Sequence, residues 1–242
     1  MMKSKLLNSL IFAALAVPGV AMAEDSPFSG NVALTTDYLY RGITQTGHKG
    51  AIQGGFDYAG PNGIYAGAWG SNISWLEEAG VGNSSLELDT YFGISNSFAE
   101  DFTYTVGFLR YNYGGEYPAG TPSANTNEIN GAIGWKWLTL KYSYAVSNLF
   151  GFTDSSGSGY AELNASYTLE GPAIDLGAHY GKQSIKGSAN TGWGYSDYNI
   201  SASKDFSGYG VALTYSSTNV DKAIWGDQAG KAKLVMTVSH SM

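Results

Sequence analysis

Histidine, serine and carboxylate side chains are the residues of this chain that could form a nucleophilic catalytic site. Such a site places a serine beside a histidine that a third polar group orients. The three histidines, His48, His179 and His240, lie far apart in the sequence. The His-x-Ser spacing that some hydrolases use is absent, because no serine stands two residues after any of them. We therefore expect that the protein is not an enzyme.

Metal and cofactor motifs are equally scarce. The chain has no cysteine, and no two of its histidines share a local motif. The glycine-rich stretch 151–159 lacks the Gly-Lys-Ser/Thr ending of a phosphate-binding loop. Carboxylates such as Glu77, Asp154 and Asp227 leave calcium binding open, although they lack an EF-hand spacing. We expect no metal site and no cofactor.

The balance of charge is acidic. Among the 242 residues, 20 are aspartate or glutamate and 13 are lysine or arginine, which gives a formal net charge of −7. Proteins that bind nucleic acid present a basic surface to the phosphates. A nucleic-acid partner is therefore not expected.

The elements that position these side chains follow a targeting segment. Lys3 and Lys5 precede an uncharged apolar run at residues 6–17, and residues 21–23 read Ala-Met-Ala, the small-x-small pattern that signal peptidase cleaves. A dozen apolar residues are too few for a membrane-spanning helix, which needs about 20. We predict a signal peptide over residues 1–23 and an exported mature domain over residues 24–242.

The mature chain divides into about twelve runs in which apolar and polar residues alternate. One run carries Leu86, Leu88 and Phe92 on one face, and another carries Leu140 and Tyr142. A period of two indicates strands, and runs of about 10 residues suit strands that cross a bilayer. No later stretch is apolar enough for a transmembrane helix. The sequence therefore predicts an all-β fold, an up-and-down antiparallel transmembrane β-barrel of about twelve strands.

The connections between the runs alternate in length. Short ones lie at 60–63, 97–101, 136–137, 170–172 and 207–208, and long ones rich in Gly, Ser, Asn and Pro lie at 43–50, 76–83, 114–125, 148–158, 184–193 and 219–230. Outer-membrane barrels have short periplasmic turns and long outer loops. We therefore place both chain ends on the periplasmic side.

Strand direction then assigns aromatic residues to two girdles at the membrane interfaces, as such barrels have. The outer girdle is predicted to contain Tyr40, Trp75, Tyr111 and Tyr215, and the inner girdle Tyr58, Trp135, Trp137, Tyr167, Phe206 and Tyr209.

Charged residues occupy the opposite face of the runs. A lysine that faces lipid at the midplane costs about 2–4 kcal/mol, so Lys141 is expected to point into the barrel. The same argument assigns to the lumen Asp37, Arg41, Asp57, Glu87, Asp89, Glu128, Lys141, Glu162, Asp175, His179 and Asp197. Two interpretations stay open: a closed interior of paired charges, or a narrow water-filled pore that prefers cations.

Residues 30–46, which read GNVALTTDYLYRGITQT, resemble the signature of the proteobacterial Gcw_chp family, also called the TorF family. The resemblance continues through AIQGGFDY at 51–58 and GIYAGAWGSN at 63–72, and it returns at 87–89, 141–144 and 203–205. It implies an outer-membrane barrel with a porin label and without an established substrate or catalytic residue.

Together these observations predict an outer-membrane porin, a passive diffusion channel for small hydrophilic solutes with a leaning towards cations. Its expected partners are outer-membrane lipid, the barrel-assembly machinery and small solutes. The alternative is a non-conducting structural or ligand-binding barrel that presents its long loops, with Tyr117, Trp193 and Trp225 as binding contacts. A soluble secreted β-sandwich is a third, weaker option.

Overall fold

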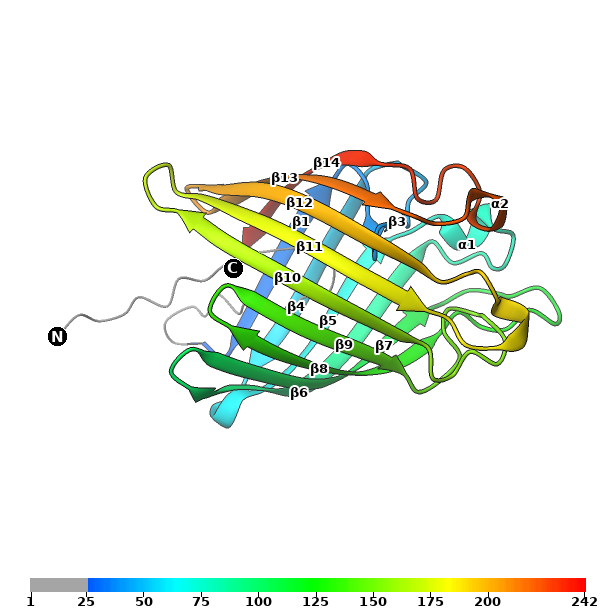
Figure 1. The fold of residues 1–242 in the computed structure, drawn as a ribbon, viewed down its shortest axis with the longest axis horizontal. Helices are drawn as coiled ribbons and strands as arrows, with labels where there is room; N and C mark the ends of the chain where they lie inside the picture. Colours follow the sequence, from blue (N-terminus) through cyan, green and yellow to red (C-terminus); the bar gives the residue numbers. More distant parts are fainter. Residues whose placement is uncertain (1–25) are drawn as a thin grey trace.

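The computed structural model describes residues 26–242, so the predicted signal peptide lies outside the described residues. The described chain forms one closed barrel of twelve strands (Figure 1). The barrel strands are β1 (Phe28–Thr35), β4 (Ala51–Ala59), β5 (Ile64–Asn72), β6 (Leu86–Ala99), β7 (Phe102–Tyr113), β8 (Thr126–Trp135), β9 (Leu138–Ala145), β10 (Gly159–Leu169), β11 (Ile174–Ser184), β12 (Tyr195–Phe206), β13 (Tyr209–Thr218) and β14 (Lys233–Ser241).

Each strand pairs antiparallel with its neighbours in the chain, and β1 closes the barrel by pairing with both β4 and β14. Leu34 is the register partner of Val238 on one side and of Ile52 on the other. Closure gives every barrel strand two partners, which removes the unpaired edges that an open sheet exposes. The predicted twelve-stranded up-and-down barrel is confirmed.

The outer surface of the barrel is apolar, because the alternation puts the large hydrophobic residues of each strand outside. Phe92, Leu140 and Ile200 are each about 60% exposed. Every barrel strand contributes at least one such residue. A continuous apolar surface of this size is incompatible with water but matches the hydrocarbon of a bilayer. The barrel is therefore built to span a membrane.

The two ends of the barrel differ, as Figure 1 shows. The tight turns, the start of β1 and the end of β14 lie at one end of the barrel, and the long connections lie at the other. In the turn between β12 and β13, Ser207 and Gly208 both have positive φ, at 58° and 92°. A two-residue hairpin needs this backbone shape to match the twist of its strands, and glycine adopts it without strain.

Four short helical segments lie between strands. They are η1 (Pro61–Gly63), α1 (Trp75–Glu78), η2 (Ser188–Asn190) and α2 (Lys222–Trp225). Among the described residues, no helix has the length and apolar character needed to cross a membrane.

The segment between β1 and β4, residues 36–50, folds into the barrel; we call it the plug. It contains a small hairpin of β2 (Leu39–Tyr40) and β3 (Ile43–Thr44), and both residues of β3 are buried. In Figure 1, β3 lies within the outline of the barrel, towards the end with the long loops. The prediction that Tyr40 lies in the outer girdle is wrong, because β1 ends at Thr35 and Tyr40 belongs to the plug. Tyr38, also beyond the end of β1, is 5% exposed and packs within the barrel.

Candidate functional site

The lumen has two zones that differ in access to water. Wall side chains of the outer half, around the plug, are almost completely buried: Glu87, Asp89, Glu128 and Asp197 are at most 2% exposed. Several inward-facing polar side chains of the inner half are only half-buried, namely Asn31, Ser95, Asn130, Ser166 and Ser203, although Ser29, Asp57 and Thr105 in the same half are buried. A cavity of about 40 Å³ opens there beside Asp175 and Ser203. The lumen is therefore less completely filled towards the short turns than towards the long loops.

Arg41 of the plug makes the main polar connection across the lumen. One guanidinium nitrogen lies 2.9 and 3.0 Å from the two carboxylate oxygens of Glu128 on β8, and the other donates to Gln183 Oε1 on β11 at 2.7 Å. Arg41 is 5% exposed and Glu128 2%. Burying two charges costs several kcal/mol per ion unless the pair is well hydrogen-bonded, as it is here.

Tyrosine hydroxyl groups extend this connection to the neighbouring strands. The Tyr38 hydroxyl donates to Glu87 Oε1 on β6 at 3.0 Å. The Tyr40 hydroxyl lies 2.8 Å from that of Tyr111 on β7, which in turn donates to Glu128 at 3.1 Å. The tip of the plug is thus bonded to three adjacent wall strands.

Asp37 organises the base of the plug. It accepts from the Thr44 hydroxyl at 2.6 Å and lies 3.0 Å from His48 Nδ1, both within the plug. On the wall, Lys233 Nζ of β14 lies 3.4 Å from the same carboxylate. Asp37 therefore fixes the plug's own fold and joins it to the barrel.

A second polar cluster lies beside Arg41 on β10, β11 and β12. His179 Nε2 is 3.0 Å from Asp197 Oδ1 and 2.9 Å from the Tyr160 hydroxyl, which also donates to Asp197 at 2.9 Å. Lys141 and Glu162 pair nearby at 3.3 Å. Each named member has a partner, so this cluster is a connected hydrogen-bonded network.

The carboxylates of Glu87 and Asp89 on β6 are poorly paired. Both are almost fully buried, yet three of their four carboxylate oxygens have no hydrogen-bond partner among the described residues. The described lumen cations Arg41, Lys141 and Lys233 pair with other carboxylates. Among the described residues, the lumen therefore contains more carboxyl groups than basic side chains.

The structure places the predicted lumen residues as follows. Asp57, Glu87, Asp89, Glu128, Lys141, Glu162, Asp175, His179 and Asp197 lie on wall strands and face inward. Asp57 accepts from the Tyr91 hydroxyl at 2.6 Å, and Asp175 from Thr168 at 2.6 Å. Asp37 and Arg41 are also inside the barrel, but on the plug instead of the wall.

The predicted outer girdle needs correction. Tyr111 is 1% exposed and faces the plug, Tyr40 belongs to the plug, and Trp75 lies in α1, where its ring packs on Tyr113. Of the four residues predicted for the outer girdle, only Tyr215 faces outward. The other outward tyrosines of the outer half are Tyr142, Tyr144, Tyr180 and Tyr198. Tyr40 and Trp75 lie beyond the ladder, where the alternation between lipid and lumen stops, whereas Tyr111 lies within β7 on the inward face that it shares with Thr105 and Leu109.

At the short-turn end, the predicted inner-girdle residues are placed on the outer surface. Tyr58 packs its ring on Phe28, with 5.2 Å between ring centroids, and Trp135 lies 6.3 Å from Phe102. Trp137, Tyr167, Phe206 and Tyr209 are each more than half exposed.

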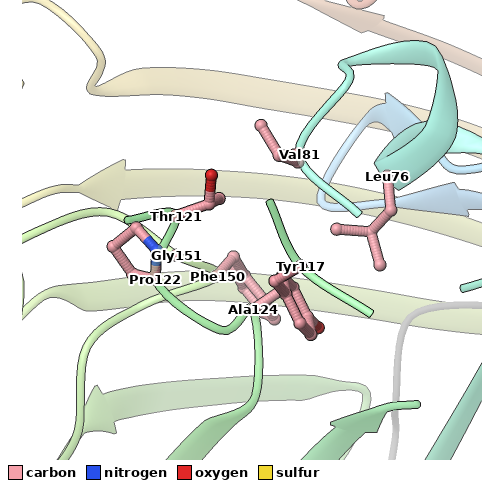
Figure 2. Close-up of a pocket in the computed structure, with 8 residues that line it drawn as sticks. All are labelled: Leu76, Val81, Tyr117, Thr121, Pro122, Ala124, Phe150 and Gly151. Carbon is pink, nitrogen blue, oxygen red and sulfur yellow. The ribbon is translucent and has the colours of Figure 1, made fainter. Parts of the chain in front are cut away.

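The long loops pack over the outer end. A cavity of about 60 Å³ lies among the loops, lined by Leu76, Val81, Tyr117, Phe150 and their neighbours (Figure 2). Trp193 and Trp225 pack on each other at 5.1 Å and on Phe152 of a third loop. The aromatic residues named as loop binding contacts therefore hold the loops together.

The sequence did not single out Gln183 and Tyr160, which contact Arg41, or Tyr38, which bonds to Glu87. Gln183 is uncharged, so the search for charges on the inward face passed over it. Tyr160 lies at the start of β10 and Tyr38 in the plug. The inward direction of Tyr160 could have been predicted, because Tyr160, Glu162 and Asn164 are spaced two residues apart and share one face of β10.

In the part of the chain that the structure describes, no group of three or more histidine, cysteine, aspartate or glutamate side chains is placed to hold a metal ion.

Comparison with solved structures finds outer-membrane porins. The NanC porin aligns with a TM-score of 0.53 at 10% identity, covering 88% of this chain and 97% of NanC. OprD of Pseudomonas aeruginosa gives 0.43 at 14% identity, covering 89% and 66%, and OccAB4 of Acinetobacter baumannii gives 0.46 at 11% identity, covering 83% and 55%. This chain thus spans slightly less than two thirds of the OprD chain. At these identities the likeness shows the fold alone.

No curated protein matches the chain in sequence. The family model described as "Bacterial protein of unknown function (Gcw_chp)" matches residues 21–242. This range covers the plug, all twelve barrel strands and the residues that join them. The chain therefore belongs to the Gcw_chp family.

Proposed function

We propose that the protein is an outer-membrane channel for small hydrophilic solutes whose outer end is closed by its first loop. The apolar surface and the barrel fold support the location, and the short turns then face the periplasm. The barrel interacts with outer-membrane lipid and with the barrel-assembly machinery, and small solutes enter its lumen.

The observation that carries the proposal is the contrast between the two halves of the lumen. The inner half is lined partly by half-buried polar side chains, and the outer half is filled by one segment, residues 36–50, that belongs to a loop. That segment contacts the wall through an ion pair and hydroxyl groups, and the rings of Tyr38 and Tyr40 also pack on Trp69 and Tyr111 of the wall. The polar contacts can be exchanged for water, which supports a closure that is reversible.

The charges of the lumen favour cations over anions. The inward carboxylates outnumber Arg41, Lys141 and Lys233, and Glu87 and Asp89 lack a basic partner among the described residues. A ring of carboxylates in a narrow passage lowers the energy of cations and raises that of anions.

The test is to replace the plug and to measure conductance in planar bilayers. Thr35 and Ala51 are register partners on adjacent strands. Residues 36–50 can therefore be replaced by a short Asn-Gly turn without moving β1 or β4. We expect rare, small conductance steps from the wild type and frequent, several-fold larger steps from the variant. Heat-modifiable migration on gels shows that both barrels are folded.

A matched control replaces a long loop that does not enter the lumen. Shortening residues 185–194 between β11 and β12 should leave the conductance at the wild-type level. A folded plug-replaced barrel that stays silent would contradict the channel proposal.

One observation favours a second function, a permanently closed structural barrel. Arg41, Glu128 and Tyr111 are as deeply buried as a protein core. In that case the plug is a stabilising element, and removing it lowers stability without producing a current.

A further inference from the structure

The guanidinium group of Arg41 lies in a site whose hydrogen-bond acceptors belong to the barrel wall, with the ring of the plug's own Tyr40 at 4.8 Å. Its nitrogens contact both carboxylate oxygens of Glu128 and the amide oxygen of Gln183. Its carbon lies 4.4 Å from the ring centroid of Tyr160. All three wall residues lie on barrel strands: Glu128 on β8, Gln183 on β11 and Tyr160 on β10. The wall part of the site therefore does not depend on a loop.

The wall groups are held in place by bonds that do not involve Arg41. The Tyr111 hydroxyl donates to Glu128 Oε2, and the Tyr160 hydroxyl donates to Asp197 Oδ2. The amide nitrogen of Gln183 donates to the carbonyl oxygens of Gly159 and Ser184, at 3.1 and 3.0 Å. These bonds turn its Oε1 towards Arg41. The site is therefore preorganised and keeps its shape when the plug moves.

The set of groups matches a guanidinium better than an ammonium. A planar cation with donors on several edges satisfies a carboxylate on one side and an amide oxygen on another, while its face lies on an aromatic ring. A lysine ammonium is a compact point charge and cannot use both the ring face and two separated acceptors in this way.

We infer that Glu128, Gln183 and Tyr160 form a binding site for guanidinium groups, and that Arg41 occupies it as an internal ligand. Without Arg41 the buried carboxylate of Glu128 loses its charge partner, and a guanidinium from solution restores that partner. Solutes that carry a guanidinium group then compete with the plug for the wall and open the lumen. This last step rests on the proposed function, whereas the binding site itself does not.

The experiment uses the full mature barrel with Arg41→Ala, in which the site lacks its internal ligand. The thermal midpoint of heat-modifiable migration is measured with increasing N-acetyl-arginine amide, and in parallel with N-acetyl-lysine amide as the matched cation. We expect the arginine derivative to raise the midpoint by several degrees and to saturate at millimolar concentration, as one-site binding to the folded state requires. The lysine derivative should have at most a small effect.

Two further variants make the result specific. In R41A/E128Q the arginine derivative should no longer raise the thermal midpoint, because the carboxylate is gone. In the barrel whose residues 36–50 are replaced by a turn, the arginine derivative should still raise the midpoint, and this variant serves as the test if R41A does not fold. No rise in either vacant-site barrel, an equal rise with the lysine derivative, or an undiminished rise in R41A/E128Q would overturn the inference.

Stability and conductance separate this inference from the proposed function. If the barrel stays silent in bilayers but is stabilised by the arginine derivative, the binding-site inference is supported and the channel proposal is contradicted. If the barrel conducts but is not stabilised, the channel proposal is supported and the binding-site inference is contradicted.

Discussion

At the scale of single residues, the ion pair between Arg41 and Glu128 places two charges where both side chains are at most 5% exposed. Removing one partner of a buried pair leaves an uncompensated charge, which costs about 3–5 kcal/mol. We expect Arg41→Ala to lower the free energy of unfolding by about that amount. Equilibrium unfolding in urea, followed by tryptophan fluorescence in detergent, measures it.

The double variant R41A/E128Q separates charge from packing. It buries no unpaired carboxylate, so we expect it to be more stable than R41A although one more side chain has changed. If the double variant is less stable than R41A, Arg41 contributes by packing on Tyr40 and Tyr160 instead of by its charge.

At the scale of elements, the plug depends on a tight turn at Gly42, which joins β2 to β3. Gly42 has a φ of +76°, and a Cβ there would lie 2.5 Å from Thr218 Cγ2 and 2.6 Å from Asp197 Cβ. An alanine therefore strains the backbone and pushes the hairpin away from β12 and β13, at a cost of about 1–3 kcal/mol. We expect Gly42→Ala to raise the frequency of conductance steps without removing any charge.

Gly114→Ala is the matched control for this substitution. Gly114 also lies at the outer end, but a Cβ there would meet nothing within 4 Å. Stability and conductance should stay at the wild-type level. An effect as large as that of Gly42→Ala would mean that the outer end responds to any loop change.

At the scale of the whole molecule, the surplus of inward carboxylates sets the sign of selectivity. With the plug replaced, the reversal potential in a potassium chloride gradient should lie towards the potassium equilibrium potential. Neutralising Glu87 and Asp89 as E87Q/D89N should move it towards zero, because these two charges lack a basic partner among the described residues.

Glu77 and Glu78 provide the control for this prediction. They are exposed in a long outer loop, so E77Q/E78Q makes the same change in net charge outside the lumen. The reversal potential should be unchanged. A shift as large as that of E87Q/D89N would assign the selectivity to the charge of the loops instead of the lumen.

The sequence by itself determined the barrel. Alternation of period two placed Leu140 outside and Lys141 inside, because strand geometry sends successive side chains to opposite faces. Short and long connections alternated as an up-and-down barrel requires, and the number of runs matched the number of strands. These features are local, so a single sequence contains them.

Only the tertiary structure decided what fills the lumen. Arg41 is far from Glu128 and Gln183 in sequence, separated from them by 87 and 142 residues, and no local pattern links them. The alternation that orients strand residues ends at Thr35, where ladder pairing with β4 and β14 stops. Beyond that point the direction of a side chain depends on the fold of the plug against the wall, which is why Tyr40, predicted for the outer girdle, is found in the plug.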